Sequence, residues 1–352
     1  MKLKDIIVLL LAASFLFPSC KGHKSKFAQV DPHDSLLYSF VLMGGCRVDK
    51  KDIYDNLPST ANVPELEQTF EDVAHIKPRP DYFFFLGDLV FGYTKTDTSM
   101  FASELNGWKK IYEQSELPKT GIRMVTIPGN HEFLTEHDGN VEVAYERQWE
   151  RIMAPFIAGS NGPGIGGEDS LPVDESKETY SFDYKNTHFV VMNTDGGGKE
   201  CKADAYWADK DISKARQNGA KHIFVLSHIP CYGPKKLDED ADLLYNRDQL
   251  WQTFENNNVE AMMSSHIHIF YAKQPHEGKT WMVISGNGGS PLNKEAKDKK
   301  KYFGYTLVKV YKSGRVLCYS YGRDVPKDGY NKPVDSKTTL RDSCEVTWGT
   351  VK

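Results

Sequence analysis

The sequence predicts an α/β fold in which two β-sheets form a sandwich with helices outside. Two observations support this fold class. From residue 36 to residue 268, apolar runs typical of buried strands alternate with segments of helical periodicity, which indicates a sheet with a parallel core. After residue 268 the pattern changes to short antiparallel strands, which we expect to close a second sheet packed on the first.

The early elements follow from the spacing of apolar residues. In the segment 64–76, apolar side chains recur at Leu66, Phe70 and Val73, and Pro64 lies at an early turn, as is typical of a helix. Similar patterns predict helices at 101–112 and 142–153. We expect strands in the apolar runs at 36–43, 81–86 and 123–127.

The later elements include an antiparallel hairpin. Residues 179–184 and 187–193 alternate between apolar and polar side chains and turn at Lys185-Asn186. Two further helices are expected at 207–217 and 246–255. The remaining strands are expected at 223–226, 259–264, 269–273, 280–284, 305–311 and 315–320.

Composition and length place the chain among globular proteins. Its 352 residues are enough to bury a large core, and 39% hydrophobic and 12% aromatic residues are ordinary values. The formal net charge of −4 argues against nucleic acid as an obligate partner. Neither an internal repeat nor a domain linker is visible, so we predict one domain at 36–323 and a polar tail at 324–352 that wraps the surface.

The first twenty residues differ from the rest of the chain. Two lysines precede an apolar run at 6–17, which is too short to span a bilayer and is typical of a signal peptide. Cys20, directly after a small residue, resembles the acylated Cys of bacterial lipoproteins; the alternative is an ordinary signal peptide with a chance Cys. We expect an exported protein of the bacterial cell envelope, held at a membrane by a lipid on Cys20, with 21–35 as a polar tether.

Metal-capable side chains follow four of the apolar strands, at the point where each strand ends. Ligands of open α/β sheets gather at the carboxyl ends of strands, so we expect these side chains to converge. Amide and carboxylate oxygens suit hard divalent cations, and imidazole suits metal binding or proton transfer near neutral pH. The side chains concerned are Asp88, Asn130 with His131 beside it, His228, and the pair His266 and His268.

The order of these motifs resembles the calcineurin-like metallophosphoesterase superfamily. The matching runs are Gly-Asp, Gly-Asn-His-Glu, a His after a strand and His-x-His, and the hairpin at 179–193 is similar to that of the purple acid phosphatase branch. The resemblance implies a metallophosphoesterase-like αββα fold. It also implies hydrolysis of a phosphomonoester or phosphodiester substrate by a hydroxide generated at two divalent or trivalent ions (Fe, Zn or Mn), or at one ion where ligands are missing.

The resemblance further implies a role for each candidate residue. His131 does not bind metal in this superfamily; it donates a proton to the leaving group or stabilises charge on the phosphoryl oxygens. The implied metal ligands are Asp88 as the bridging carboxylate, Asn130, His228 and His266 on one ion, and His268 on the other.

The first motif of the superfamily, Asp-x-His after the first strand, is absent. If Gly45 occupies the Asp position, Arg47 occupies the His position and both ligands are lost. If Cys46 occupies the Asp position, Val48 follows in the His position and one thiolate ligand survives.

We expect the second arrangement, in which Cys46 joins Asp88 and His268 around the first ion. A thiolate ligand favours Zn or Fe over Mg or Mn. The alternative is that Cys46 is a small buried residue or half of a disulfide.

Two functions remain open at this point. The retained Asn130-His131 pair favours an enzyme, because a binding protein has little use for a proton donor there. The absent first motif instead suits a one-metal or inactive relative that binds a phosphorylated or glycan ligand. The charge-transfer tyrosine of purple acid phosphatases is not supported, since Phe91 stands three residues after Asp88 and Tyr93 comes two positions late. Oligomeric state is not encoded in any pattern we identified.

Overall fold

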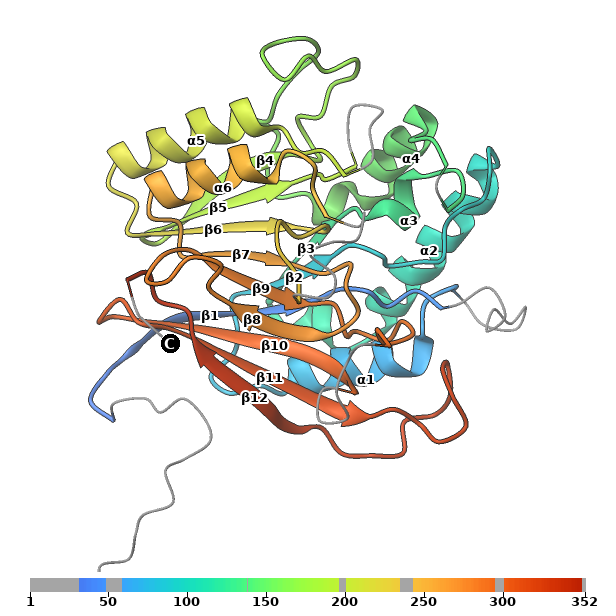
Figure 1. The fold of residues 1–352 in the computed structure, drawn as a ribbon. Coiled ribbons are helices and arrows are strands. Elements are labelled where there is room, and N and C mark those ends of the chain that lie inside the picture. Colours follow the sequence, from blue (N-terminus) through green and yellow to red (C-terminus); the bar gives the residue numbers. More distant parts are fainter. Residues whose placement is uncertain are drawn as a thin grey trace, which may run out of the picture.

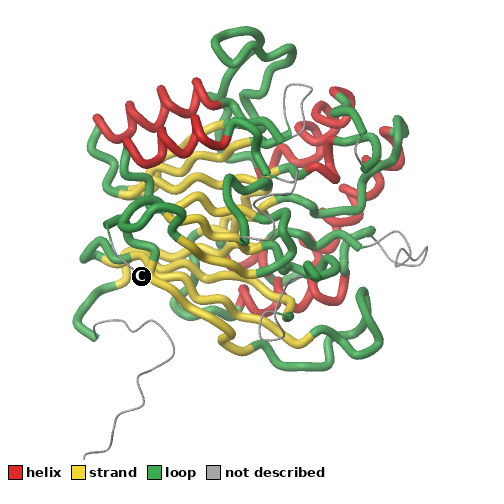
Figure 2. Tube along the Cα trace, viewed as in Figure 1, coloured by secondary structure: helices red, strands yellow, loops and turns green. Residues whose placement is uncertain are grey.

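The computed structural model describes residues 32–48, 59–137, 139–195, 201–234, 243–294 and 301–349. In these ranges the chain forms two six-stranded sheets stacked face to face, with helices on the outer face of each (Figures 1 and 2). The αββα sandwich expected from the sequence is therefore confirmed. The predicted signal peptide, Cys20 and the beginning of the tether lie outside the described residues.

The first sheet has the strand order β12-β11-β10-β1-β2-β3. Its parallel part consists of β1 (Leu36–Met43), β2 (Tyr82–Leu86) and β3 (Arg123–Ile127). Three antiparallel strands extend it from the other edge of β1: β10 (Tyr302–Tyr311), β11 (Val316–Asp324) and β12 (Thr339–Glu345).

The second sheet has the order β4-β5-β6-β7-β9-β8. The central strands β5 (Thr187–Met192), β6 (His222–Ser227), β7 (Ala261–Ser264) and β9 (Trp281–Ser285) are parallel. The two edge strands are antiparallel to their neighbours: β4 (Tyr180–Tyr184) and β8 (Phe270–Lys273).

The helices divide between the two outer faces (Figure 1). Those that pack on the first sheet are α1 (Val63–Ala74), α2 (Thr98–Gln114) and α4 (Val143–Met153). Those on the second sheet are α5 (Ala205–Gln217) and α6 (Arg247–Asn256). One turn of helix, α3 (Asn130–Phe133), and two 3₁₀ turns, η2 (Leu117–Thr120) and η3 (Ala154–Phe156), complete the set. No helix of the described ranges is long and apolar enough to cross a membrane.

Three apolar layers hold these elements together: one between the sheets and one beneath the helices of each face. The inner layer is rich in aromatic rings; the Phe40 ring lies 5.6 Å from that of Phe84, 5.5 Å from that of Phe189 and 5.4 Å from that of Phe224. Burying one such side chain stabilises the fold by about 1.5–3 kcal/mol. The sandwich is therefore a stiff support for the loops at its edge.

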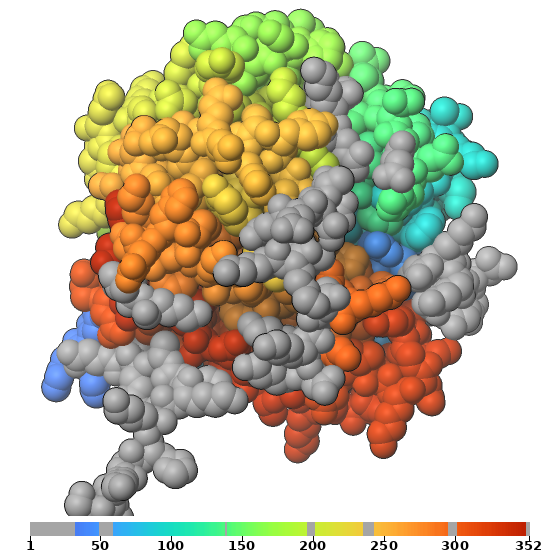
Figure 3. Space-filling view, in the orientation of Figure 1, coloured from blue at the N-terminus to red at the C-terminus, as the bar shows by residue number. Residues whose placement is uncertain are grey.

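The C-terminal strands join a different sheet from the one we predicted. β8 and β9 complete the second sheet, but β10, β11 and β12 extend the first, and β12 lies beyond the expected domain boundary at residue 323. In the space-filling view the C-terminal residues that include β10, β11 and β12 (orange-red to red) form the lower part of the visible face (Figure 3). The alternating pattern of β10 provides Leu307 to the helix-side core and Val308 to the inner core, so it suits an edge of either sheet.

A buried ion pair network ties the first sheet to its helix. Arg323 on β11 is fully buried and donates from Nε to Glu65 (2.8 Å) and from Nη1 to Asp72 (2.8 Å), both on α1. Removing one member of such a network leaves an uncompensated buried charge. The end of the predicted domain is thus anchored in the core, and the chain continues from there into the edge strand β12.

Candidate metal centre

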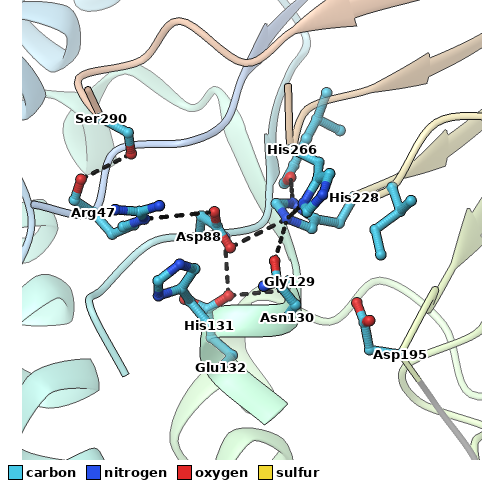
Figure 4. Close-up of polar contacts among 12 residues, drawn as sticks. Arg47, Asp88, Gly129, Asn130, His131, Glu132, Asp195, His228, His266 and Ser290 are labelled. Carbon is cyan, nitrogen blue, oxygen red and sulfur yellow. Dashed lines mark hydrogen bonds and ion pairs between the residues drawn. The ribbon is translucent and has the colours of Figure 1, made fainter. Parts of the chain in front are cut away.

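The candidate residues lie on loops that follow parallel strands of both sheets. Asp88 follows β2 and Asn130 and His131 follow β3, whereas His228 follows β6 and His266 and His268 follow β7. The carboxyl ends of parallel strands meet at one edge of a sheet, so the stacking of the two sheets brings the loops together. Figure 4 shows Asp88 between Arg47 on one side and His228 with Asn130 on the other.

Glu132 holds two of these loops in register. Its buried carboxylate accepts hydrogen bonds from the backbone N–H groups of Asp88 (2.9 Å) and Leu89 (2.8 Å) in one loop. It also accepts from the N–H of Gly129 (2.8 Å) in the other. Glu132 thereby fixes the backbone around Asp88.

The Asp88 turn is left-handed. Gly87 has φ = 84° and Asp88 has φ = 57°, a region that Asp and Asn tolerate better than most residues. A Cβ on Gly87 would lie 2.4 Å from Nδ1 of His228, so Gly at this position allows the turn to approach the imidazole. The Gly-Asp pair seen in the sequence therefore has a steric reason.

His228 lies at the centre of the cluster. Its Nδ1 lies 2.8 Å from the carbonyl oxygen of Leu86, a hydrogen bond that places the proton on Nδ1 and leaves Nε2 to face the other residues. The Nε2 atom is 3.2 Å from Oδ1 of Asp88, 3.1 Å from Oδ1 of Asn130 and 3.2 Å from Nδ1 of His266. The side chains of Asp88, Asn130 and His228 are buried, and His266 is partly buried.

These separations fit the ligand set of one metal ion. Ligand atoms that each lie about 2.1 Å from an ion in tetrahedral or octahedral geometry are about 3.0–3.4 Å from one another. The three distances around Nε2 of His228 fall in that range. Two imidazoles, one carboxylate and one amide oxygen suit Zn, Fe or Mn.

A second group of ligand atoms is incomplete. His268 uses Nδ1 to contact the carbonyl oxygen of Pro291 (2.8 Å), and its Nε2 lies 3.7 Å from Oδ2 of Asp88. Nε2 of His268 and Oδ1 of Asp88 are buried and make no hydrogen bond of acceptable geometry. Buried polar atoms without partners are costly, which supports positive charge or a hydrogen-bond donor near each of these two atoms.

Charge in the cluster is concentrated on one pair. Burial opposes ionisation of Asp88, but the charged imidazole of His228 outweighs it and holds the pKa of the carboxyl well below its usual range. Burial alone would lower the pKa of His228, and the Asp88 carboxylate instead raises it to about 9. Burial lowers the pKa of His266 and of His268, so both are neutral and able to bind metal.

In the described ranges, no group of three or more His, Cys, Asp or Glu side chains is arranged so that these side chains alone could hold a metal ion. The four donors around Nε2 of His228 suit a metal by their chemistry and by their distances from that atom. One of them is the amide oxygen of Asn130, which is not among those four residue types.

The structure does not bring Cys46 to this cluster. Its side chain is fully buried in the core between the first sheet and its helices, where Sγ donates to the carbonyl oxygen of Asn62 (3.7 Å). Burial raises the pKa of the thiol above its usual range, which disfavours a thiolate. The neighbours of Cys46 face the centre instead: Nε of Arg47 lies 4.0 Å from Oδ2 of Asp88. We therefore correct the expected ligand set by leaving Cys46 out.

Tyr93 is a site residue that the sequence did not identify. Its hydroxyl accepts a hydrogen bond from Nδ2 of Asn130 (2.6 Å), which directs Oδ1 of Asn130 toward His228. Its ring lies 4.0 Å from the ring of His131. A left-handed backbone at Tyr93 (φ = 54°) produces this placement, and a single sequence carries no signal for it. Tyr93 thus orients a candidate metal ligand through its hydroxyl.

His131 lies beside the cluster, and its side chain contacts groups other than the four fitting donors. Its Nδ1 contacts the carbonyl oxygen of Phe91, and its ring packs on Tyr93. Burial lowers the pKa of His131 to about 3. The carboxylate of Asp88 acts to raise this pKa, and the positive charge of Arg47 acts to lower it. The ring is neutral, and the proton that its hydrogen bond requires is on Nδ1.

Stacked sheets with carboxylate, amide and imidazole donors at the carboxyl ends of their strands define a metallophosphoesterase type of protein. A family model of calcineurin-like phosphoesterases matches residues 31–270. The chain belongs to the calcineurin-like phosphoesterase family.

Curated relatives and a solved structure agree with this assignment. The serine/threonine-protein phosphatase CPPED1 of Rattus norvegicus is 24% identical over 245 residues, which cover 65% of this chain and 66% of the relative. The Homo sapiens protein of the same name is 22% identical over 244 residues, with the same coverage. This chain thus spans just under two thirds of the length of these relatives.

The purple acid phosphatase PPD1 from yellow lupin (Lupinus luteus) seeds shares the fold. Its structure superposes with a TM-score of 0.56 at 15% identity, covering 88% of this chain and 54% of the lupin chain.

Proposed function

We propose that this protein hydrolyses phosphomonoesters or phosphodiesters at a metal held by Asp88, Asn130, His228 and His266. The observation that supports this most directly is the set of three distances, 3.1–3.2 Å, around Nε2 of His228. A divalent ion in such a place polarises the phosphoryl group and activates water. The protein restrains these donors, because Asp88, Asn130 and His228 are buried, and the side chains of His228 and Asn130 are each oriented by a further hydrogen bond.

His131 is the residue we propose for assistance to the leaving group. With the Nδ1 proton committed to Phe91, Nε2 carries a proton only when the ring is charged. The anionic phosphoryl group of a substrate favours that charged form, since an opposite charge nearby raises a His pKa. The imidazolium then donates from Nε2 to the oxygen that departs.

The function is tested by a substrate screen on metal-loaded protein. We expect turnover with Zn²⁺, Mn²⁺ or Fe on p-nitrophenyl phosphate, bis-p-nitrophenyl phosphate or a phosphoserine peptide, the last suggested by the names of the curated relatives. EDTA should abolish this turnover and metal should restore it. Protein that binds metal and phosphorylated ligands without hydrolysing any ester would contradict the proposal and favour the binding-protein alternative.

We also propose that the chain is exported and lipid-anchored through Cys20. The support is the charged start, the apolar run at 6–17 and the Cys that follows a small residue. The full chain expressed in a bacterium should partition into detergent, and Cys20→Ser should move it to the aqueous phase. Mass spectrometry of the mature N-terminus should find acylated Cys20; an internal, unmodified Cys20 would refute the anchor.

A further inference from the structure

The loop after β1 determines how many cations the centre holds. Gly45 has φ = +64°, and a Cβ built on it would lie 2.9 Å from Cδ2 of His268 and 2.6 Å from the carbonyl oxygen of Gly286. This position therefore faces His268 and has no room for a side chain. An Asp at residue 45, which the resemblance would require as a metal ligand, does not fit the observed backbone.

Arg47 lies two residues further along the chain and faces the same centre. Its backbone N–H donates to the carbonyl oxygen of Asp88 (3.1 Å), and its own carbonyl accepts from Oγ of Ser290 (2.8 Å). These bonds place the guanidinium beside Asp88, with Nε 4.0 Å from Oδ2 (Figure 4). Cys46, between the two, points away into the core.

The guanidinium of Arg47 retains capacity to bind a ligand. Its Nε atom is buried and makes no hydrogen bond, and the 4.0 Å contact with Asp88 is longer than a hydrogen bond. One fifth of the side chain is exposed (20%), so the end of the fork is accessible. A guanidinium that stays charged at all ordinary pH values and presents parallel donors suits phosphoryl oxygens.

We propose that Arg47 replaces one of the two cations of the family's metal pair and binds the non-bridging oxygens of the substrate phosphoryl group. This inference rests on the proposed function and refines it: the centre is a one-metal site with a built-in cation. Asp88 directs Oδ1 toward His228, where the donors would hold the metal, and Oδ2 toward Arg47. The covalent chemistry is unchanged, because Arg47 contributes charge and hydrogen bonds and no proton.

The test measures metal content and binding of inorganic phosphate on the full chain loaded with Zn²⁺. We expect about one Zn²⁺ per chain in the unmodified protein and in Arg47→Ala. The affinity for orthophosphate, measured by calorimetry, should fall about 10–100-fold in Arg47→Ala, the value of a charged hydrogen-bonding contact. Arg47→Lys should give an intermediate loss, because it keeps the charge without the fork.

Arg151→Ala is the matched control, since it removes the same charge from an arginine of α4 whose guanidinium contacts Gln148 on the surface. Its phosphate affinity should equal that of the unmodified protein. Two Zn²⁺ per chain in the unmodified protein, or an unaltered phosphate affinity in Arg47→Ala, would overturn the role of Arg47.

The same measurements separate this inference from the proposed function. One Zn²⁺ per chain with phosphate binding that depends on Arg47 supports the inference even if no ester is hydrolysed. Ester hydrolysis by a protein with two Zn²⁺ per chain supports the function and rejects the inference.

Discussion

Asp88→Asn should lower kcat/KM on any phosphoester substrate by at least about 10³-fold and remove the bound metal. The change replaces one oxygen of the carboxylate by NH₂ and removes the negative charge opposite His228 (3.2 Å) and Arg47 (4.0 Å). Asn also tolerates the left-handed backbone of residue 88 (φ = 57°), so the turn should survive. The loss is therefore one of charge and coordination, with the fold retained.

Metal analysis and circular dichroism on the same samples check this result. Asp248→Asn is a suitable control, because Asp248 lies on α6 with 90% of its side chain exposed. An Asp88→Asn variant that keeps both its metal and its rate would show that the metal, if bound, lies elsewhere.

His131→Ala should lower kcat by about 10²–10⁴-fold on an alkyl phosphate while leaving the metal content unchanged. The side chain contacts Phe91 and Tyr93 and is not one of the four donors around His228, so its removal spares the proposed ligand set. The loss should be much smaller on p-nitrophenyl phosphate, whose leaving group needs little protonation. The measurement is the ratio of kcat values for the two esters.

A purely structural role for His131 would reduce both esters equally. His276→Gln serves as the control, since His276 is exposed and pairs with Glu255 on the surface. If His131→Ala also releases the metal, leaving-group assistance no longer explains the loss of rate.

Much of the candidate centre could be predicted from sequence, because each of its residues follows a strand that is recognisable by itself. The apolar run of β2 ends before Gly87-Asp88, and that of β6 ends at His228, whatever the rest of the chain does. Parallel strands align their carboxyl ends, so local strand ends indicate a shared location. The alternation of strands and helices likewise predicted a two-sheet sandwich with helices outside, although β10, β11 and β12 extend the first sheet and not the second.

The features that could not be predicted depend on contacts between distant segments. Whether Gly45 or Cys46 faces the centre depends on where β1 stops relative to β2, and a shift of one residue exchanges the two faces. Pairing of β10 with β1 rather than with the second sheet is another such choice, since its alternating side chains suit either edge. The loop after β1 packs against two different parts of the protein. Cys46 lies in the core beneath the helices of the first sheet, and Arg47 lies beside Asp88. Local sequence thus determined which residues can bind metal, whereas strand register, a non-local property, determined which of them meet.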